Sequence, residues 1–140
     1  MLMSALYRSH AMLGRESSAE QALLKHARAK NHSSSVSGYL HREEDVYYQW
    51  IEGPVQTIEA LLVKLQGDPR HACFSLLNKQ VIAQRQFPSW TMGYSSADKG
   101  TLLEWAVRND LSLRVFDPAK MVAFFRDQIS QGEAGDRPMA

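Results

Sequence analysis

Residues 46–53 place a single uncharged amide, Gln49, inside a segment that is otherwise rich in β-branched and aromatic residues. Such segments favour the pleated, half-buried surface of a β-sheet. The glutamine side chain offers two N–H donors and an acceptor oxygen, and burying such a group without partners costs about 1–3 kcal/mol. Taken alone, the segment is most simply an edge strand with Gln49 pointing to water. The rest of the sequence instead favours a strand that holds the amide in a polar site.

The hydrophobic periodicity up to residue 96 predicts elements in the order β-α-β-β-α-β-β. The first helix has Ser17 or Ser18 as its cap, with Glu20 placed for a capping box, and runs to about residue 30. A second helix is expected to carry Pro54 in its first turn and to end at the Gly-Asp-Pro of residues 67–69. The strands are expected at residues 2–8, 36–40, 46–51, 73–77 with 81–83 as one bent element, and 90–94. This order indicates an α+β, ferredoxin-like fold, a sheet with two helices on one face.

Two further helical segments are predicted at about residues 99–108 and 118–131. Their apolar residues need a surface to bury against, and the other face of the sheet is the expected one. Large aromatic side chains should anchor them, because aromatics dominate burial energetics: Trp105, Phe116, Phe124 and Phe125. We therefore expect a domain at residues 1–96, a helical extension at 97–131 and a disordered tail at 132–140.

Composition excludes several classes of protein. The 140 residues, 44% of them hydrophobic, suffice for one globular domain with its own core. The formal net charge is +1 with both signs interspersed, which predicts no binding to nucleic acid or to an anionic membrane. The single cysteine, Cys73, excludes an internal disulfide and fits a reducing compartment. With no signal peptide and no apolar run near the ~18 residues of a membrane span, we expect a soluble, cytoplasmic protein.

Common catalytic motifs do not occur. The sequence contains no glycine-rich phosphate loop and no G-x-S-x-G. The histidines lack metal-ligand spacing, so no metal site is expected. The acidic residues 43–45 are most simply a solvated turn between two strands. We therefore expect no enzyme activity of these classes.

Four polar or soft residues occur within or at the end of apolar elements: Tyr7, Asn31, Gln49 and Met92. In a ferredoxin-like fold the first and third strands are central neighbours, so Tyr7 and Gln49 are expected side by side. The first helix packs beside them and ends near Asn31. The sequence thus predicts a phenol and two amides along one groove between the two helices.

With this constellation the chain resembles the BLUF domains, which are flavin-binding sensors of blue light. The resemblance covers roughly residues 1–96. It rests on five motifs in the family's order: Leu6-Tyr7-Arg8-Ser9, Asn31 ahead of Val36-Ser37-Gly38, Tyr48-Gln49-Trp50-Ile51-Glu52-Gly53, Asp68-Pro69-Arg70-His71, and Phe87-Pro88-Ser89-Trp90-Thr91-Met92. The C-terminal helices carry little of the match.

The resemblance implies a flavin between the two helices, with its ring edge against Tyr7, Asn31 and Gln49. The flavin is expected to be FAD, with FMN or riboflavin as alternatives. Leu23 and Leu65 would clasp the ring from its two sides, although on their own they would be ordinary core residues.

The resemblance also implies that Arg70 and His71 lie near the ribityl and phosphate end, with Lys64 helping there. Arg70 alone would be a surface charge after a helix. Lys30 departs from the family, which usually has Asn or His at this position near the flavin edge. The segment 36–41 also departs from the usual Ile-Thr-Gly pattern. Neither departure touches the Tyr7–Gln49 pair.

The implied chemistry uses these residue types directly. A phenol beside an excited flavin can give it an electron and then a proton, and Tyr7 is neutral in the dark because its reference pKa is ~10. Gln49 can donate and accept at once, so its rotation or tautomerisation rewires the hydrogen bonds around the ring and shifts its absorption to the red. Trp90 and Met92 on the last strand would carry the change to the C-terminal helices. The sequence leaves open which of the two lies next to Gln49.

The favoured hypothesis is a small photoreceptor that signals through a separate protein partner or through its own assembly as a homo-oligomer. After residue 96 the chain is too short for a cyclase or phosphodiesterase domain. The alternatives are a ferredoxin-like interaction module without flavin and a flavin-dependent redox enzyme. The latter is disfavoured because no substrate acid or base accompanies the Tyr7–Gln49 pair.

Overall fold

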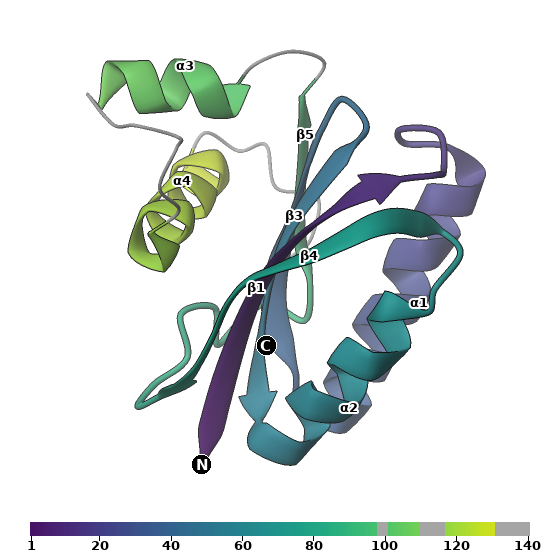
Figure 1. The fold of residues 1–140 in the computed structure, drawn as a ribbon, viewed down its shortest axis with the longest axis vertical. Coiled ribbons are helices and arrows are strands. Elements are labelled where there is room, and N and C mark those ends of the chain that lie inside the picture. Colours follow the sequence, from purple (N-terminus) through teal and green to yellow (C-terminus); the bar gives the residue numbers. More distant parts are fainter. Residues whose placement is uncertain (98–100, 110–116, 131–140) are drawn as a thin grey trace.

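The computed structural model describes residues 1–97, 101–109 and 117–130, which form one sheet and four helices. The elements in chain order are β1 (Leu2–Ala11), α1 (Ser18–Ser34), β2 (Ser37–Glu43), β3 (Val46–Pro54), α2 (Val55–Gln66), β4 (His71–Ile82), β5 (Gly93–Ala97), α3 (Thr101–Arg108) and α4 (Pro118–Ser130). In Figure 1, α1 and α2 lie side by side on one face of the sheet, and α3 and α4 lie beyond its other face. The predicted order of elements is confirmed.

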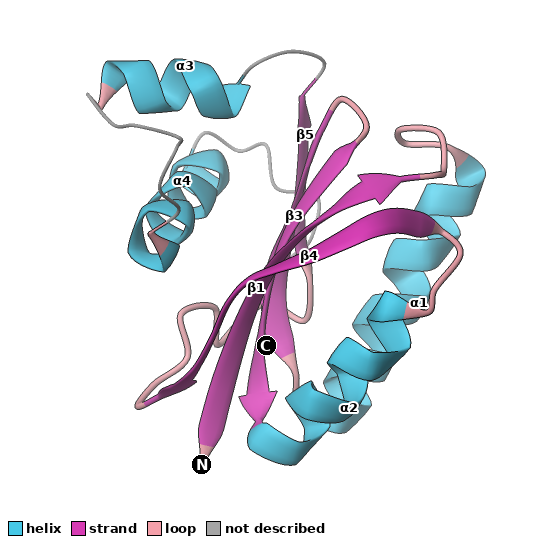
Figure 2. Ribbon diagram, viewed as in Figure 1, coloured by secondary structure: helices cyan, strands magenta, loops and turns pink. Residues whose placement is uncertain are grey.

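The strand order of the sheet is β4-β1-β3-β2-β5. Neighbouring strands are antiparallel except for β2 and β5, which pair in parallel. The expected central neighbours, β1 and β3, are paired in a register that sets Tyr7 opposite Gln49. Figure 2 shows the resulting layers of helix, sheet and helix. The fold is therefore α+β and ferredoxin-like, as predicted.

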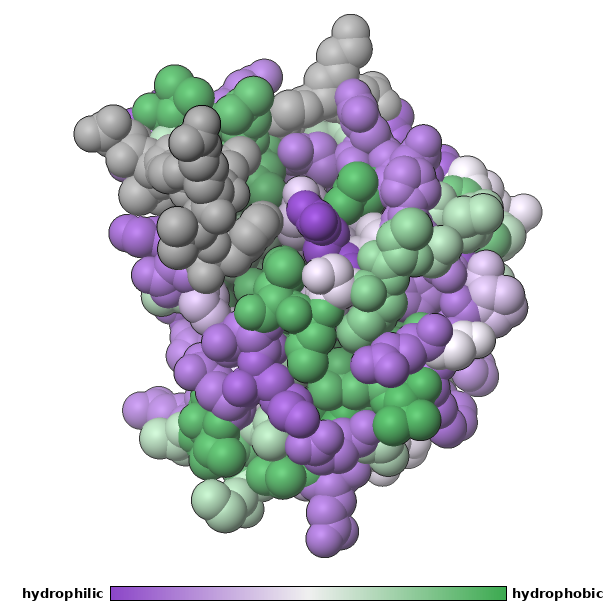
Figure 3. All heavy atoms as spheres, in the orientation of Figure 1, coloured by the Kyte–Doolittle hydropathy of each residue, from purple (hydrophilic) through white to green (hydrophobic). Residues whose placement is uncertain are grey.

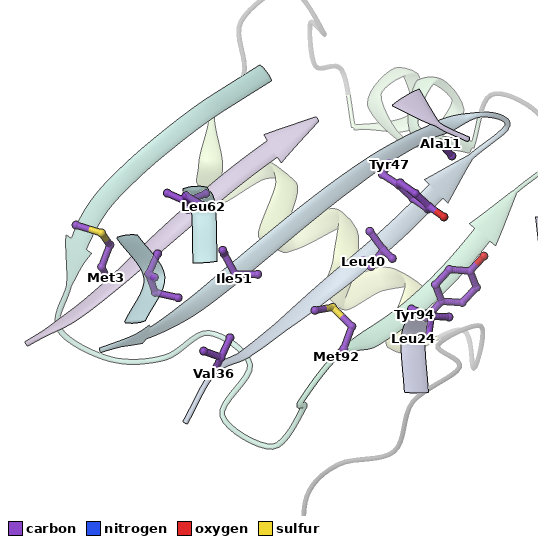
Figure 4. Packing of buried hydrophobic residues seen from close by; sticks show 12 residues of the cluster. Met3, Ala11, Leu24, Val36, Leu40, Tyr47, Ile51, Leu62, Met92 and Tyr94 are labelled. Atoms are coloured by element: carbon purple, nitrogen blue, oxygen red, sulfur yellow. The ribbon is translucent and has the colours of Figure 1, made fainter. Parts of the chain in front are cut away.

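Successive residues of each strand point to opposite faces of the sheet, which gives the domain two separate cores. Leu40 and Ile51 belong to the core under α1 and α2, whose members lie along one face in Figure 4. Their sequence neighbours Tyr39 and Trp50 belong to the core under α3 and α4. Adjacent residues of one strand thus serve two different surfaces.

The C-terminal helices bury their apolar faces on the sheet, as the sequence predicts. The residues they contribute to this second core are Leu102, Trp105, Ala106, Met121, Val122, Phe124 and Phe125. Tyr39 stacks on Phe125 with ring centroids 4.9 Å apart, and so joins β2 directly to α4. Phe116, also predicted as an anchor, and the predicted tail 132–140 lie outside the described residues.

The first helix begins where the sequence indicates and ends later. Ser17 is its N-cap, and the Ser17 hydroxyl oxygen accepts a hydrogen bond from the backbone N–H of Glu20 at 3.2 Å. The helix continues to Ser34 and ends at Ser35, which adopts a left-handed conformation with φ 61°. Asn31 therefore lies inside the last turn of α1, where its side chain has a fixed direction.

The prediction of a last strand at residues 90–94 is wrong, because β5 begins only at Gly93. The preceding residues are not part of the regular ladder, although the Trp90 carbonyl accepts a hydrogen bond from the backbone N–H of Gly38 in β2 at 3.0 Å. The backbone N–H of Trp90 donates to the carbonyl of Phe87 at 3.2 Å, and the carbonyl of Thr91 accepts from the Asn31 side chain at 2.7 Å. Trp90 and Met92 thus lie in the loop that leads into β5, not on the strand.

The surface seen in the orientation of Figure 1 carries separate hydrophobic groups broken up by hydrophilic side chains (Figure 3). Among the described residues, no helix combines the length and the apolar character that crossing a bilayer requires.

Candidate functional site

A groove of about 560 Å³ opens between α1 and α2 on their face of the sheet. Leu23 of α1 and Leu65 of α2 line it from the two helices, while Gln49 and Met92 line it from the sheet side. The same four residues also line a smaller adjoining space that reaches Tyr7. The volume and the mostly apolar walls are typical of a site for a small organic ligand.

Hydrogen bonds join three buried side chains at the inner end of this groove. The Tyr7 hydroxyl donates to Oε1 of Gln49, its cross-strand partner. Nε2 of Gln49 donates to Sδ of Met92 at 3.1 Å. A thioether is a weak acceptor, so this second bond is weaker than the first. The amide is held firmly by a phenol on one side and loosely by sulfur on the other.

Tyr7 is neutral in this setting. Its side chain is buried on β1, and its ring stacks on Phe74 with centroids 4.6 Å apart. Burial raises the pKa of the Tyr7 hydroxyl far above its usual value, and the neighbouring Tyr47 and Asp68 raise it further. The proton of the phenol therefore stays on the oxygen and in the hydrogen bond to Gln49 at any ordinary pH.

The structure resolves the choice between Trp90 and Met92 that the sequence leaves open. Met92 is buried and contacts the amide of Gln49, whereas Trp90 packs against the core under α3 and α4. The two side chains therefore lie toward opposite faces of the sheet. In this structure Trp90 does not line the groove.

Two residues of α1 hold the loop that carries Met92. Nδ2 of Asn31 donates to the carbonyl of Thr91 at 2.7 Å, and Nε of Arg28 donates to the carbonyl of Met92 at 3.1 Å. Asn31 also lines the groove, so its amide lies within reach of a ligand there. Sequence reasoning found Asn31 but missed Arg28, because nothing in the local pattern distinguishes it from a solvated helix charge.

The outer part of the groove is cationic. Lys30, Lys64 and Arg70 line it, and Arg70 forms an ion pair with Asp68 at 2.7 Å. Hydrogen bonds from Arg70 lower the pKa of the Asp68 carboxyl and outweigh the opposing effect of burial. Nε2 of His71 is buried at the inner space without a hydrogen-bond partner among the described residues. The structure thus brings every predicted flavin-binding residue to these two adjoining spaces.

A buried charged cluster beside the groove was not predicted. Arg42, expected near a solvated turn, is only 1% exposed, and its Nη1 lies 2.7 Å from Oε2 of the equally buried Glu20. Glu20 also accepts hydrogen bonds from the hydroxyls of Tyr47 and Tyr94. The alternation of β2 was an available signal, because it sets Arg42 on the same face as the core residue Leu40.

A family comparison identifies the chain. A sequence model of BLUF, described as sensors of blue-light using FAD, matches residues 2–93. The chain belongs to the BLUF family. The matched region holds both groove helices and the whole Tyr7–Gln49–Met92 chain. The chain is accordingly a BLUF blue-light sensor that uses FAD.

Individual relatives agree with this assignment. The photoactivated adenylate cyclase subunit beta of Euglena gracilis is 28% identical over 72 residues, which are 51% of this chain and 8% of that protein. The dark-state structure of the BLUF protein BlrB has a TM-score of 0.74 at 24% identity, covering 93% of this chain and 96% of that one. The Klebsiella pneumoniae protein BlrP1, solved with FMN and cyclic diGMP, has a TM-score of 0.65 at 28% identity, covering 94% and 35%.

The family description names FAD, and the BlrP1 structure contains FMN. The groove fits such a molecule on its own features, since Leu23 and Leu65 offer apolar contacts to a flat ring and Gln49 offers polar contacts to its edge. Nε2 of the partly exposed His71 is a buried, unpaired polar atom that a ligand would satisfy. Within residues 1–97, 101–109 and 117–130, no group of three His, Cys, Asp or Glu side chains could hold a metal ion.

Proposed function

We propose that this BLUF domain senses blue light through Tyr7 and Gln49 and signals through α3 and α4, either to a separate protein partner or by changing its own assembly. The observation that carries the proposal is the bond from the Tyr7 hydroxyl to Gln49, whose amide also reaches Met92. Residues 1–96 would form the photosensory domain and residues 97–131 the output segment.

The ligand contacts follow from where each side chain lines the groove. Leu23 and Leu65 would sandwich the ring, while Asn31 and Gln49 would hydrogen-bond its polar edge. The cations at the outer part, Lys30, Lys64 and Arg70, would bind the phosphates of the side arm, with His71 as a further contact deeper in. Lys30 adds a positive charge on the α1 wall, so it would contact a phosphate more readily than a neutral ring edge.

When bound, the flavin supplies blue-light absorption and a strong excited-state oxidant. Tyr7 would give an electron to this oxidant and then pass its hydroxyl proton along the hydrogen bond to Oε1 of Gln49, and both would return to Tyr7 as the dark state re-forms. Loss of this donor would free the amide, and among the residues that the structure describes the remaining hydrogen bond that opposes its rotation is the weak one to Met92. After rotation or tautomerisation, Gln49 would present a different donor to the ligand. No covalent bond is made, so the change reverses in the dark.

The route to the C-terminal helices begins one residue after Met92. Gly93 lies so close to β2 that an added Cβ would be 2.4 Å from Cδ2 of Tyr39. Tyr39 in turn stacks on Phe125 of α4. A shift of the loop at Met92 would therefore press on this ring pair and change how α4 docks. Trp90 packs against the same core and would take part in the change.

The test is an absorption spectrum before and after blue light, recorded for the wild type and for Gln49→Leu. Leucine has a similar size but no donor or acceptor, so we expect the variant to keep its flavin and lose the light-induced red shift. Gln66→Leu is the matched control, because Gln66 is exposed at the end of α2, and it should keep a normal shift.

A wild-type shift and recovery in Gln49→Leu would contradict the role of this amide. A wild type that purifies without colour and takes up no added FAD would favour the flavin-free interaction module instead.

A further inference from the structure

The loop entering β5 is held to α1 at two successive backbone carbonyls. Asn31 binds the carbonyl of Thr91 at 2.7 Å, and Arg28 binds the carbonyl of Met92 at 3.1 Å. Both donors come from one helix, one turn apart. Since Sδ of Met92 reaches Gln49, the same two contacts determine where the sulfur lies relative to the amide.

A third contact holds the next part of this segment. The Tyr94 hydroxyl donates to Oε1 of Glu20 at 2.8 Å, and Glu20 is fully buried in an ion pair with Arg42. A carboxylate held by a buried guanidinium resists movement, because displacement would leave a buried charge unpaired. Figure 4 shows Tyr94 and Met92 on the same side of the sheet, near Leu24 of α1. We call Glu20, Arg28 and Asn31 the α1 clamp.

We propose that the α1 clamp, and Arg28 above all, positions Met92 against Gln49 in the dark and so sets the lifetime of the light-induced state. The inference rests on the proposed function, because it assigns a regulator to the same amide. Arg28 does not line the groove, and its Nε donates to the backbone carbonyl of Met92. It is a positioning residue that acts through Met92.

The direction of the effect follows from the weak bond between Gln49 and Met92. The rotated amide returns more readily when Sδ of Met92 stays at its dark-state position, because it can then accept the hydrogen bond from Nε2 of Gln49 again. Without Arg28 the carbonyl of Met92 loses its charged donor, the loop loosens and the amide has a poorer partner to return to. We expect dark recovery to slow about three- to tenfold, the size of effect of one ordinary hydrogen bond, because solvent at this half-buried site weakens the charge-assisted bond.

The experiment compares Arg28→Gln, Arg28→Lys and the control Lys25→Gln, which removes a positive charge from an exposed position of the same helix. Two quantities are measured on each protein. The first is hydrogen exchange of residues 91–97 in the dark, with and without FAD. The second is the rate at which the light-induced red shift decays. Tyr94→Phe, which removes only the hydroxyl that binds Glu20, provides a second and milder variant.

We expect faster exchange at residues 91–97 and slower recovery in Arg28→Gln, partial restoration in Arg28→Lys and no change in Lys25→Gln. Tyr94→Phe should act in the same direction with a smaller effect. If the wild type responds to light and both Arg28→Gln and Tyr94→Phe match its exchange and recovery, the proposed role of the α1 clamp is refuted. The wild type could instead show no light response while Arg28→Gln still speeds exchange at residues 91–97. In that case the proposed function is wrong, and so is the role of Arg28 in setting the lifetime. The contact by which Arg28 positions the loop would still be supported.

Discussion

Glu52→Gln should strongly destabilise the fold. The Glu52 carboxylate is fully buried on β3 and accepts hydrogen bonds from four donors. They are the Trp50 indole N–H at 2.8 Å, the Ser37 hydroxyl at 2.9 Å and the backbone N–H groups of Gln86 at 2.7 Å and Phe87 at 2.8 Å. This one side chain therefore joins β2, β3 and the loop at residues 85–87.

The size of the effect can be worked out from these donors. A glutamine keeps one acceptor oxygen and replaces the other by an NH₂ group. The less damaging orientation keeps the oxygen toward Trp50 and Gln86, which leaves the buried N–H of Phe87 facing another donor. Losing that bond costs about 1.5–3 kcal/mol, and replacing a charged acceptor by a neutral one weakens the others. We expect a loss of about 3 kcal/mol in the free energy of unfolding.

The measurement is urea unfolding followed by far-ultraviolet circular dichroism, with the same saturating FAD in every sample. A loss of this size should also lower Tm by about 10 °C in a chain of this length. Glu59→Gln is the control, since Glu59 forms only an exposed ion pair with Lys79 at 3.2 Å, and it should cost less than about 1 kcal/mol. Equal stability of the two variants would refute the reasoning.

Three further outcomes are expected. Tyr7→Phe should abolish the red shift and lengthen the flavin fluorescence lifetime, whereas Tyr48→Phe, on the opposite face of β3, should not; a normal photocycle in Tyr7→Phe would exclude Tyr7 as the donor. Hydrogen exchange of residues 101–109 and 117–130 should differ between dark and light, and identical protection would exclude these helices as the output. Burial raises the pKa of Glu20, but hydrogen bonds from Tyr47, the Glu16 backbone, Arg42 and Tyr94 outweigh it and lower the pKa. The stability advantage of wild type over Glu20→Gln should therefore be greatest at neutral pH and shrink as the pH falls below ~4, in urea unfolding at several pH values; an advantage independent of pH would contradict this.

Most of the fold could be predicted because its signals are local. Period-two and period-3.6 patterns locate the strands and helices, and Ser17 locates the start of α1. The neighbouring positions of Tyr7 and Gln49 follow from the topology, since the first and third strands of this fold pair at its centre. The groove then follows, because Leu23 and Leu65 lie on the two helices that cover that pair.

The residues that escaped prediction depend on partners far away in the sequence. Arg28 gains its role from Met92, and Arg42 is buried because Glu20 on another element neutralises it. A charge in a sequence is normally solvated, and only the three-dimensional pairing reveals the exception. The start of β5 was misplaced for the same reason, since the Thr91 carbonyl accepts a hydrogen bond from the side chain of Asn31, a partner far away in the sequence.

A one-residue error in the pairing register of β1 and β3 would affect both faces of the sheet at once. Leu6 and Trp50 face one core while their neighbours Tyr7 and Gln49 face the groove. Slipping one strand by a single residue would exchange these two sets, because side chains alternate with a period of two. Such a molecule would lose both the groove between α1 and α2 and the surface on which α4 packs. If the flavin binds in this groove as proposed, its yellow colour would report on strand register, and a chain that takes up flavin would also have built the surface on which its C-terminal helices dock.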